Sequence, residues 1–161
     1  MPEPEVVHEA PPSVHLDMPG HLLRRCHQIA VAVFMNECRS LDLTPLQFVA
    51  LSALNHHGAM DHATLGGAAA LDRTTVAVVV KNLTERGLVS TERSKADRRS
   101  KIIAITDAGR ALFQSALPAV ETAQKKILEP LSQAERETLV ALLGKLALKN
   151  NTLSRAPIRE V

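Results

Sequence analysis

The chain has 161 residues, 45% of them hydrophobic, and a formal net charge of +2. This length allows one domain with a buried core, and because no apolar run approaches the roughly 18–20 residues that span a bilayer, we expect no membrane partner. The chain begins without the basic-then-apolar pattern of a signal peptide, so we expect a cytoplasmic protein. Three phenylalanines, with no tryptophan or tyrosine, favour helices packed on helices over a β-sandwich.

Charge is distributed unevenly along the chain. Residues 1–20 contain four carboxylates and no lysine or arginine, whereas residues 72–110 contain nine lysines and arginines against five carboxylates. A basic centre is the pattern expected of a surface that binds phosphate, and a solvated face of mixed charge is the alternative. Residues 1–18 are rich in proline and acid without a sustained period, so we expect a flexible N-terminal arm.

The first predicted helix covers residues 19–41. Its apolar residues form two stripes: Leu22, Cys26, Ile29 and Val33 on one, and Leu23, Ala30, Phe34 and Leu41 on the other. So wide an apolar surface predicts burial against the helix's own domain on one side and against a second protomer on the other. Cys26 and Cys38 would lie about 18 Å apart along this helix, so they form no disulfide within it.

Two shorter helices are predicted next. Thr44 and Gln47 form the capping box of a helix that ends near Gly58. Asp61 is a candidate N-cap for a short helix over residues 62–69, in which two glycines lower the intrinsic helix propensity. This short helix is expected to brace the helix that follows it.

The following helix starts at Arg73 and carries the residues that say most about function. Its apolar residues recur at i, i+3, i+4 and i+7, which predicts a buried face made of Val76, Val79, Val80 and Leu83. The opposite face is slim, has no carboxylate until Glu85 and carries hydroxyl and cationic donors, as a helix lying in the major groove of DNA requires. Its residues, all candidate DNA contacts, are Arg73, Thr74, Thr75, Ala77, Val78 and Lys81.

Two short strands joined by a polar loop are predicted after this helix. Gly87 marks the end of the helix, and residues 88–93 and 101–105 alternate their side chains with the period of strands. A helix–turn–helix followed by a basic hairpin is a winged helix, in which the hairpin tip reaches the minor groove. A solvated hairpin tip is the alternative. The candidate DNA contacts in the loop are Lys95, Arg98 and Arg99.

Two further helices complete the predicted chain. One covers residues 107–128 and contains Pro118, which is expected to bend it or to interrupt one turn. The other begins at the capping box of Ser132, and residues 151–161 are expected to be a loose tail.

The predicted fold class is mainly α with a small β-hairpin wing. We expect a single domain over residues 19–150, with a winged helix-turn-helix over about 44–105. Dimerisation helices over about 19–41 and 107–150 flank it. Because these long helices cannot fold back over so small a centre, pairing in a homodimer is expected to bury them.

Three segments together resemble the MarR family of winged-helix transcriptional regulators, over roughly residues 20–150. They are Leu43–Pro45 followed by Gln47 and Phe48, the run from Leu71 to Val89, and Asp97–Arg99 followed by Ile105, Thr106 and Gly109. The resemblance implies a homodimer that binds a pseudo-palindromic operator in double-stranded DNA and usually represses transcription. It also implies that a small molecule between the dimerisation helices and the winged helix changes the spacing of two recognition helices, which must lie roughly 34–36 Å apart.

Val78 departs from the family pattern, since many members carry an arginine at the matching position. One potential base or phosphate contact is therefore missing. Readout is expected to depend on Arg73, Thr74, Thr75 and Lys81, with Ala77 or Val78 touching thymine methyl groups.

The start of the first helix is crowded with cationic and imidazole side chains beside apolar ones, near where the family's ligand cleft lies. This combination suits a phenolic or aromatic acid, or its coenzyme A thioester, and residues 22–34 also resemble members that control aromatic-acid degradation. We expect a small-molecule effector of this class and no cofactor; interface salt bridges are the alternative role. The candidate effector contacts are His21, Arg24, Arg25, Gln28, Met35 and His57.

Other functions find less support in the sequence. His56, His57 and His62 form the only histidine cluster, and without a nearby cysteine we expect no metal site. A redox-responsive regulator would need a lowered thiol pKa at Cys26 or Cys38, and a buried structural role is the alternative we favour. No nucleophile–base set or phosphate loop indicates an enzyme, so we expect no catalytic residues. A helical interaction protein that binds no DNA is the third class, and salt-dependent binding to duplex DNA would exclude it.

Overall fold

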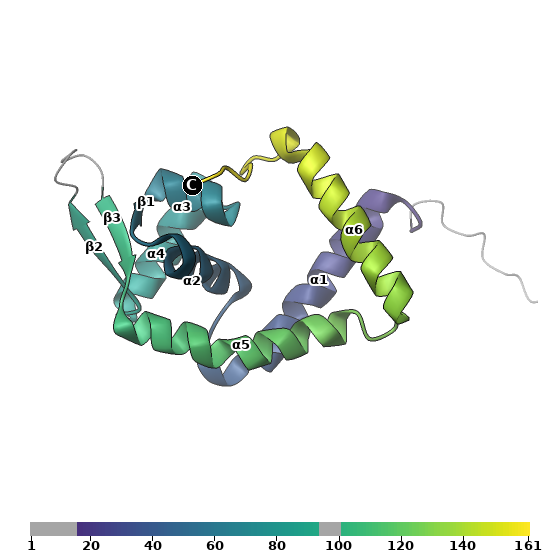
Figure 1. Ribbon diagram of the computed structural model, residues 1–161, viewed down its shortest axis with the longest axis horizontal. Helices are drawn as coiled ribbons and strands as arrows, with labels where there is room; N and C mark the ends of the chain where they lie inside the picture. Colours follow the sequence, from purple (N-terminus) through teal and green to yellow (C-terminus); the bar gives the residue numbers. More distant parts are fainter. Residues whose placement is uncertain (1–15, 94–100) are drawn as a thin grey trace, which may run out of the picture.

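The computed structural model describes residues 16–93 and 101–161. Helices dominate this part of the chain and the strands form one small sheet, which confirms the predicted class. Figure 1 shows the sheet grouped with the shorter helices at one end, longer helices at the other, and a long helix running between the two groups. The N-terminal arm that we expected falls mostly on residues 1–15, which lie outside the described residues.

The first helix, α1 (Pro19–Glu37), is shorter than predicted. A 3₁₀ turn, Arg39–Leu41, follows it, whereas we expected one helix to residue 41. Asp42 then adopts a left-handed conformation with φ of +48°, which redirects the chain toward the next helix. This left-handed residue, which the apolar pattern does not indicate, separates α1 from the winged helix.

The next two helices begin at the predicted caps. For α2 (Pro45–His57), the Thr44 hydroxyl accepts from the Gln47 amide at 3.2 Å, and the Gln47 side chain accepts from the Thr44 amide at 3.1 Å. For α3 (His62–Ala69), the Asp61 carboxylate accepts a hydrogen bond from a backbone amide of the first turn at 2.8 Å. Both N-termini are thus fixed by local hydrogen bonds that satisfy otherwise unpaired amides.

The helix α4 (Arg73–Glu85) buries the face that its periodicity predicts. Gly87, with φ of +68°, ends it as expected. Together with α2, α3 and the sheet, this face forms an aliphatic core. The apolar residues of α4 in that core are Val76, Val79, Val80 and Leu83.

The sheet has one more strand than predicted. Strands β2 (Val89–Arg93) and β3 (Lys101–Ile105) form the antiparallel hairpin, with β2 starting one residue later than expected. A third strand, β1 (Met60–Asp61), pairs with the other side of β3, so that Met60 lies opposite Ile103. Because β1 has only two residues, it shows no alternation that sequence periodicity could detect.

The long helix α5 (Asp107–Ile127) runs along α1 and continues through Pro118 without interruption. An ion pair of 2.7 Å between Lys126 of α5 and Glu37 joins the two helices near their ends, and it holds the pKa of the Glu37 carboxyl below its usual range. The last helix, α6 (Gln133–Lys149), has no buried residue in the single chain.

The C-terminal segment differs from the loose tail that we expected. A 3₁₀ turn, Asn151–Leu153, follows α6, and the chain then returns to the winged helix. There the backbone amide of Arg159 donates to the carbonyl of Gly67 on α3 at 3.1 Å. The sequence pattern of this segment carries no signal for a contact with a residue more than 90 positions away.

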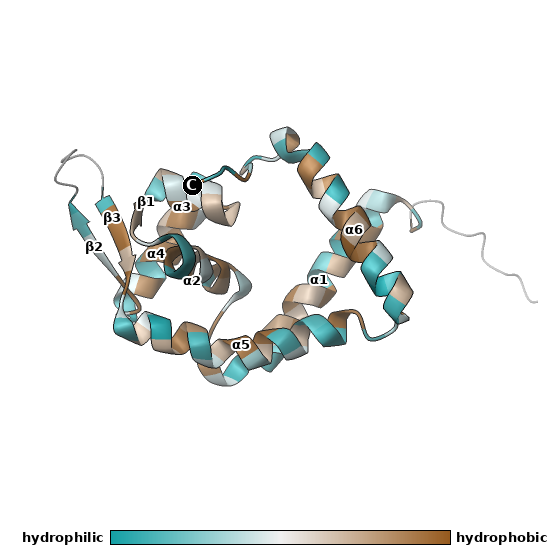
Figure 2. Ribbon diagram, in the orientation of Figure 1, coloured by the Kyte–Doolittle hydropathy of each residue, from teal (hydrophilic) through white to brown (hydrophobic). Residues whose placement is uncertain are grey.

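Hydrophobic residues are distributed over the inner faces of the winged helix and over parts of α6 (Figure 2). No single helix of the described residues has the length and apolar composition to cross a membrane, although α3 and α4, bent by 104°, would pass that test as a pair.

Candidate DNA-binding surface and effector region

The start of α4 is fixed by Asp72. Its two carboxylate oxygens accept from the backbone amide of Thr75 at 2.9 Å and from the Thr75 hydroxyl at 3.0 Å. These hydrogen bonds hold the pKa of the Asp72 carboxyl below its usual range. The Thr75 hydroxyl is therefore engaged in capping, while the hydroxyl of its neighbour Thr74 lies on the exposed surface.

The outward face of α4 matches the composition on which the DNA-contact prediction depends. Glu85 is its first carboxylate, at the C-terminal end, where it lies 3.8 Å from the Lys81 ammonium. Thr75 alone among the predicted contacts on α4 is half-buried. The exposed members of the predicted set are Arg73, Thr74, Ala77, Val78 and Lys81.

A groove of about 300 Å³ lies between this face and the N-terminus of α2. Leu46 and Asn82 line it together with Thr74 and Val78. The prediction from sequence missed Asn82, although 74, 78 and 82 are spaced by four and must share a helix face. The groove therefore adds α2 and one amide side chain to the candidate surface.

The described base of the wing carries two cations opposite each other. Arg93 ends β2 and Lys101 begins β3, and the two are paired across the hairpin, both exposed. Like charges directly opposite are unfavourable unless an anion lies nearby. We did not predict this pair from the sequence. Its place at the two strand ends beside a basic loop is the signal that would have allowed the prediction. The predicted contacts Lys95, Arg98 and Arg99 lie outside the described residues.

The far end of α4 is fastened by Arg86. Its guanidinium donates to the backbone carbonyls of Leu41 and Asp42 and lies 3.4 Å from the side-chain oxygen of Gln47. Gln47 is the one polar residue with a buried side chain in the described chain. One cation thus ties the end of the recognition helix to the connection between α1 and α2.

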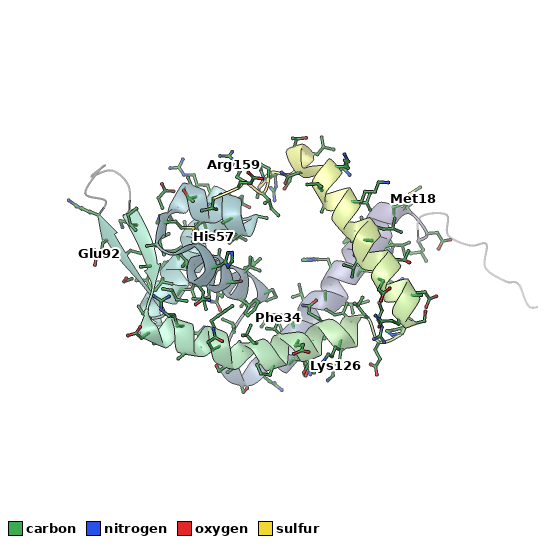
Figure 3. All side chains as sticks on the ribbon, viewed as in Figure 1. Met18, Phe34, His57, Glu92, Lys126 and Arg159 are labelled. Atoms are coloured by element: carbon green, nitrogen blue, oxygen red, sulfur yellow. The ribbon has the colours of Figure 1, made fainter. Side chains whose placement is uncertain are left out.

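The candidate effector residues are brought together only in part. Arg24 donates to Gln28 at 3.1 Å on the exposed surface of α1. One ring nitrogen of His21, Nε2, is buried and has no hydrogen-bond partner among residues 16–93 and 101–161. Arg25 and Met35 are exposed. His57 lies on α2, on the winged-helix side of the molecule (Figure 3). The single chain therefore separates His57 from the N-terminal half of α1.

A second groove, of about 650 Å³, lies at the corner between α5 and α6. Its lining includes Lys125 and Val140, and none of the predicted effector residues. The Arg136 side chain shapes this corner by donating to the backbone carbonyls of Leu128 and Leu131.

The two cysteines have different environments. Cys38 is fully buried, and burial raises the pKa of its thiol, which disfavours the reactive thiolate. Cys26 is exposed in the single chain, contrary to the buried role that we favoured. Within the described ranges, no three His, Cys, Asp or Glu side chains are grouped to hold a metal ion.

Comparison with known proteins gives a consistent result. The model of the MarR family matches residues 43–101. The HTH-type transcriptional repressor NicR of Pseudomonas putida is 35% identical over 127 residues, which cover 79% of this chain and 80% of NicR.

Solved structures agree with this match. BpsR of Bordetella bronchiseptica, whose DNA binding is regulated by 6-hydroxynicotinic acid, is 38% identical, with a TM-score of 0.75 over 80% of this chain and 97% of BpsR. The transcriptional repressor CouR, solved bound to a 23-mer DNA duplex, is 28% identical, with a TM-score of 0.74 over 81% of this chain and 92% of CouR.

Proposed function

The chain belongs to the MarR family of DNA-binding transcriptional regulators, which are not enzymes, and from this premise we propose a homodimeric repressor that a small aromatic acid releases from its operator. The operator is a pseudo-palindromic duplex, with one half-site for each protomer. The effector is an aromatic or heteroaromatic carboxylic acid, or the coenzyme A thioester of one.

The observation that carries the DNA-binding part is the exposed face of α4. Thr74, Ala77 and Val78 give it small donors and methyl groups, and its one acid lies at the end away from the first turn. The cation pair of Arg93 and Lys101 at the wing base supplies positive charge beside it. Such a face fits a major groove, while the wing cations suit the adjacent phosphates.

The effector part is supported by α1 and by BpsR. An effector carboxylate would find cations at Arg24 and Arg25, and Nε2 of His21, buried without a partner in the described part of the chain, offers a further polar contact. BpsR, 38% identical, responds to 6-hydroxynicotinic acid, a hydroxylated heteroaromatic acid, which makes that compound the first to test.

We propose the dimer from the apolar surface that the single chain leaves open. Leu22 and Ile29 of α1 are exposed, as are five large apolar residues of α6: Val140, Leu142, Leu143, Leu146 and Leu148. In this organisation residues 19–41 and 107–150 join the protomers, and residues 44–105 form the two DNA-reading units.

The experiment is a fluorescence-anisotropy titration of a labelled duplex from upstream of the protein's own gene. The label belongs on the DNA because the chain contains no tryptophan or tyrosine to report binding. We expect tight binding that 6-hydroxynicotinic acid or another member of a panel of aromatic acids and thioesters releases. A scrambled duplex of equal length is the control for sequence specificity.

Point variants separate the two activities. Arg25→Ala is expected to blunt release by the effector and to leave operator affinity unchanged, whereas Lys149→Ala, a matched exposed cation on α6, should change neither. Tight binding that no compound releases would contradict the effector part. Absence of sequence-specific binding would contradict the whole proposal.

A further inference from the structure

The C-terminal segment connects the end of α6 to the helix-turn-helix. After the 3₁₀ turn Asn151–Leu153 the chain crosses to α3, where Arg159 lies beside the end of that helix (Figure 3). The Arg159 amide donates to the Gly67 carbonyl at 3.1 Å. A helix predicted to serve dimerisation is thus linked to the DNA-reading unit by a second route, in addition to α5.

The segment is held in shape by one side chain. The Asn151 amide group donates to the Ile158 carbonyl at 2.9 Å and accepts from the Ile158 amide at 2.8 Å. Two hydrogen bonds from one side chain close the loop between these residues and hold Arg159, the next residue, in position. Without these two hydrogen bonds, the segment would have to lose far more conformational freedom to reach α3.

On α3, the segment meets an acceptor that the helix itself does not use. The chain leaves α3 through Ala70, which has a left-handed backbone, and the Leu71 amide donates to the Gly66 carbonyl. The Gly67 carbonyl therefore accepts from the Arg159 amide instead. The last carbonyls of a helix lack intrahelical partners, so the segment provides a cap. Gly67 also allows close packing, since a Cβ there would lie 3.1 Å from the Cβ of Arg159.

The same segment also borders the other side of the turn between α3 and α4. Arg155 lies close enough to Asp72 for its positive charge to help lower the pKa of that carboxyl, after the larger effect of the hydrogen bonds from Thr75. Asp72 is the N-cap of α4. The segment therefore contacts the end of one helix and approaches the cap of the next.

We propose that residues 151–161 form a strap that positions the recognition helix for DNA by capping α3. The docked strap fixes the turn from which α4 starts, so the DNA-reading conformation is populated before the operator binds. Chains with an undocked strap must order this turn on binding, which lowers the apparent affinity. This role is one of positioning, without contact between the strap and DNA, and it rests on the DNA-binding function proposed above.

Amide hydrogen exchange tests the docking without reference to DNA. In the full chain, the amides of Ile158 and Arg159 are expected to exchange slowly, and Asn151→Ala should make both exchange at the rate of an open chain. The amides of α2 and α5 should keep their protection, which shows that the fold is intact. Rapid exchange of Ile158 and Arg159 in the unaltered protein would overturn the proposal.

Operator affinity tests the positioning role. Arg159→Pro removes the amide that donates to the Gly67 carbonyl and should weaken operator binding about fivefold, which corresponds to about 1 kcal/mol. Arg159→Ala keeps the donor and should weaken binding less than twofold. Gly67→Ala should resemble Arg159→Pro, because its Cβ crowds the strap, whereas Gly144→Ala on α6, where nothing lies within 4 Å, should not.

The two proposals fail in different ways. If the unaltered protein binds no operator while Ile158 and Arg159 are protected, the DNA-binding function fails and the docking stands. If it binds operator and Arg159→Pro binds equally well, the strap does not position α4. The last test is the slope of log operator affinity against log salt concentration for Arg155→Ala, and we expect it to be unchanged. A slope lower by about one phosphate would show that the strap contacts DNA itself, which overturns a pure positioning role.

Discussion

At the C-terminal end of α4, the guanidinium of Arg86 donates to the carbonyls of Leu41 and Asp42, residues that precede it by more than 40 positions. Asp42 has a left-handed backbone, so its carbonyl points where no regular element satisfies it. Gln47, buried beside this cation, also caps α2. A single side chain therefore supplies donors to the segment that joins α1 to the winged helix.

Arg86→Ala should destabilise the fold by about 1–3 kcal/mol, because it leaves acceptors of the α1–α2 connection without a donor. Urea unfolding followed by far-ultraviolet circular dichroism measures this loss. Arg86→Lys should recover only part of the stability, since an ammonium cannot reach several divergent acceptors at once. Equal midpoints for Arg86→Ala and the unaltered chain would show that solvent replaces these bonds.

Arg93→Ala should lower the dependence of operator affinity on salt by about one phosphate, a slope change of roughly 0.9 in log K against log salt. Lys101→Ala should do the same, since the two cations lie opposite each other at the wing base. Anisotropy titrations at several salt concentrations provide the slopes. Glu92→Gln, an adjacent exposed residue on the same strand, is the control for a change of charge, and no loss of slope in either alanine variant would remove the pair from the interface.

For single residues, the spacing along the sequence predicted most of what the structure shows. The exposed and buried faces of α4 follow from a period of 3.6, and Asn82 would have followed from the same period. Arg86 could not have been assigned, because its acceptors are carbonyls whose direction depends on a left-handed residue far away in sequence. Arg93 and Lys101 could have been predicted as a cation pair, because they occupy the two strand ends beside a basic loop.

Among the elements, α3 and α4 share one device at their N-termini: a carboxylate that accepts hydrogen bonds from backbone amides. These bonds hold the pKa of both Asp61 and Asp72 below the ordinary value. The pKa of an unfolded aspartate is about 3.9. Since the folded state has the lower pKa, the caps contribute fully above that value, and their contribution is lost as pH falls through the lowered pKa.

Asp72→Asn should therefore reduce the loss of stability below about pH 4, because asparagine caps a helix without titrating. Urea unfolding at neutral pH and at about pH 3 measures the difference. Asp107, in the first turn of α5, offers a control as Asp107→Asn, since its carboxylate is not the cap of that helix. An equal pH dependence for Asp72→Asn and the unaltered chain would show that this cap does not govern acid unfolding.

The capped elements were predictable because each cap lies within three residues of the amide that it satisfies. The capping boxes of Thr44 and Ser132 and the N-cap Asp61 all appear in the structure as the sequence predicts. The end of α1 and strand β1 were not predictable. The former depends on a left-handed turn and the latter on pairing with a strand 40 residues later, and neither leaves a periodic pattern.

Considered as a whole molecule, the chain places a covered winged helix at one end and poorly covered helices at the other (Figure 1). In α6, Leu146 and Leu148 are 52% and 75% exposed, and no residue of the helix is buried. The sequence predicted that long terminal helices need a partner, because amphipathic stripes have to be covered. It gave no signal for the strap, which depends on a contact between opposite ends of the folded chain.

Leu146→Glu should shift the protein from a dimer toward the monomer mass of 17.4 kDa, since a carboxylate would be buried without a partner in an apolar interface. Light scattering after size exclusion measures the mass, and operator binding should weaken in parallel. Lys145→Ala, next to it on the same helix, is the control and should stay dimeric. A dimer of unchanged stability in Leu146→Glu would place the interface elsewhere.

Strand β1 has a consequence for the spacing of base pairs within an operator. Asp61 both ends this strand and caps α3, while Met60 is paired with a strand of the hairpin, so that one sheet joins the base of the wing to the helix-turn-helix. The protein then sets the offset along the DNA between the base pairs that face α4 and the position that faces the wing. Inserting one base pair within a half-site, about 3.4 Å of helix rise, would move one contact away from its target. Inserting one between half-sites keeps this offset within each half-site and instead changes the separation and rotation of the two half-sites, which the two protomers have to match.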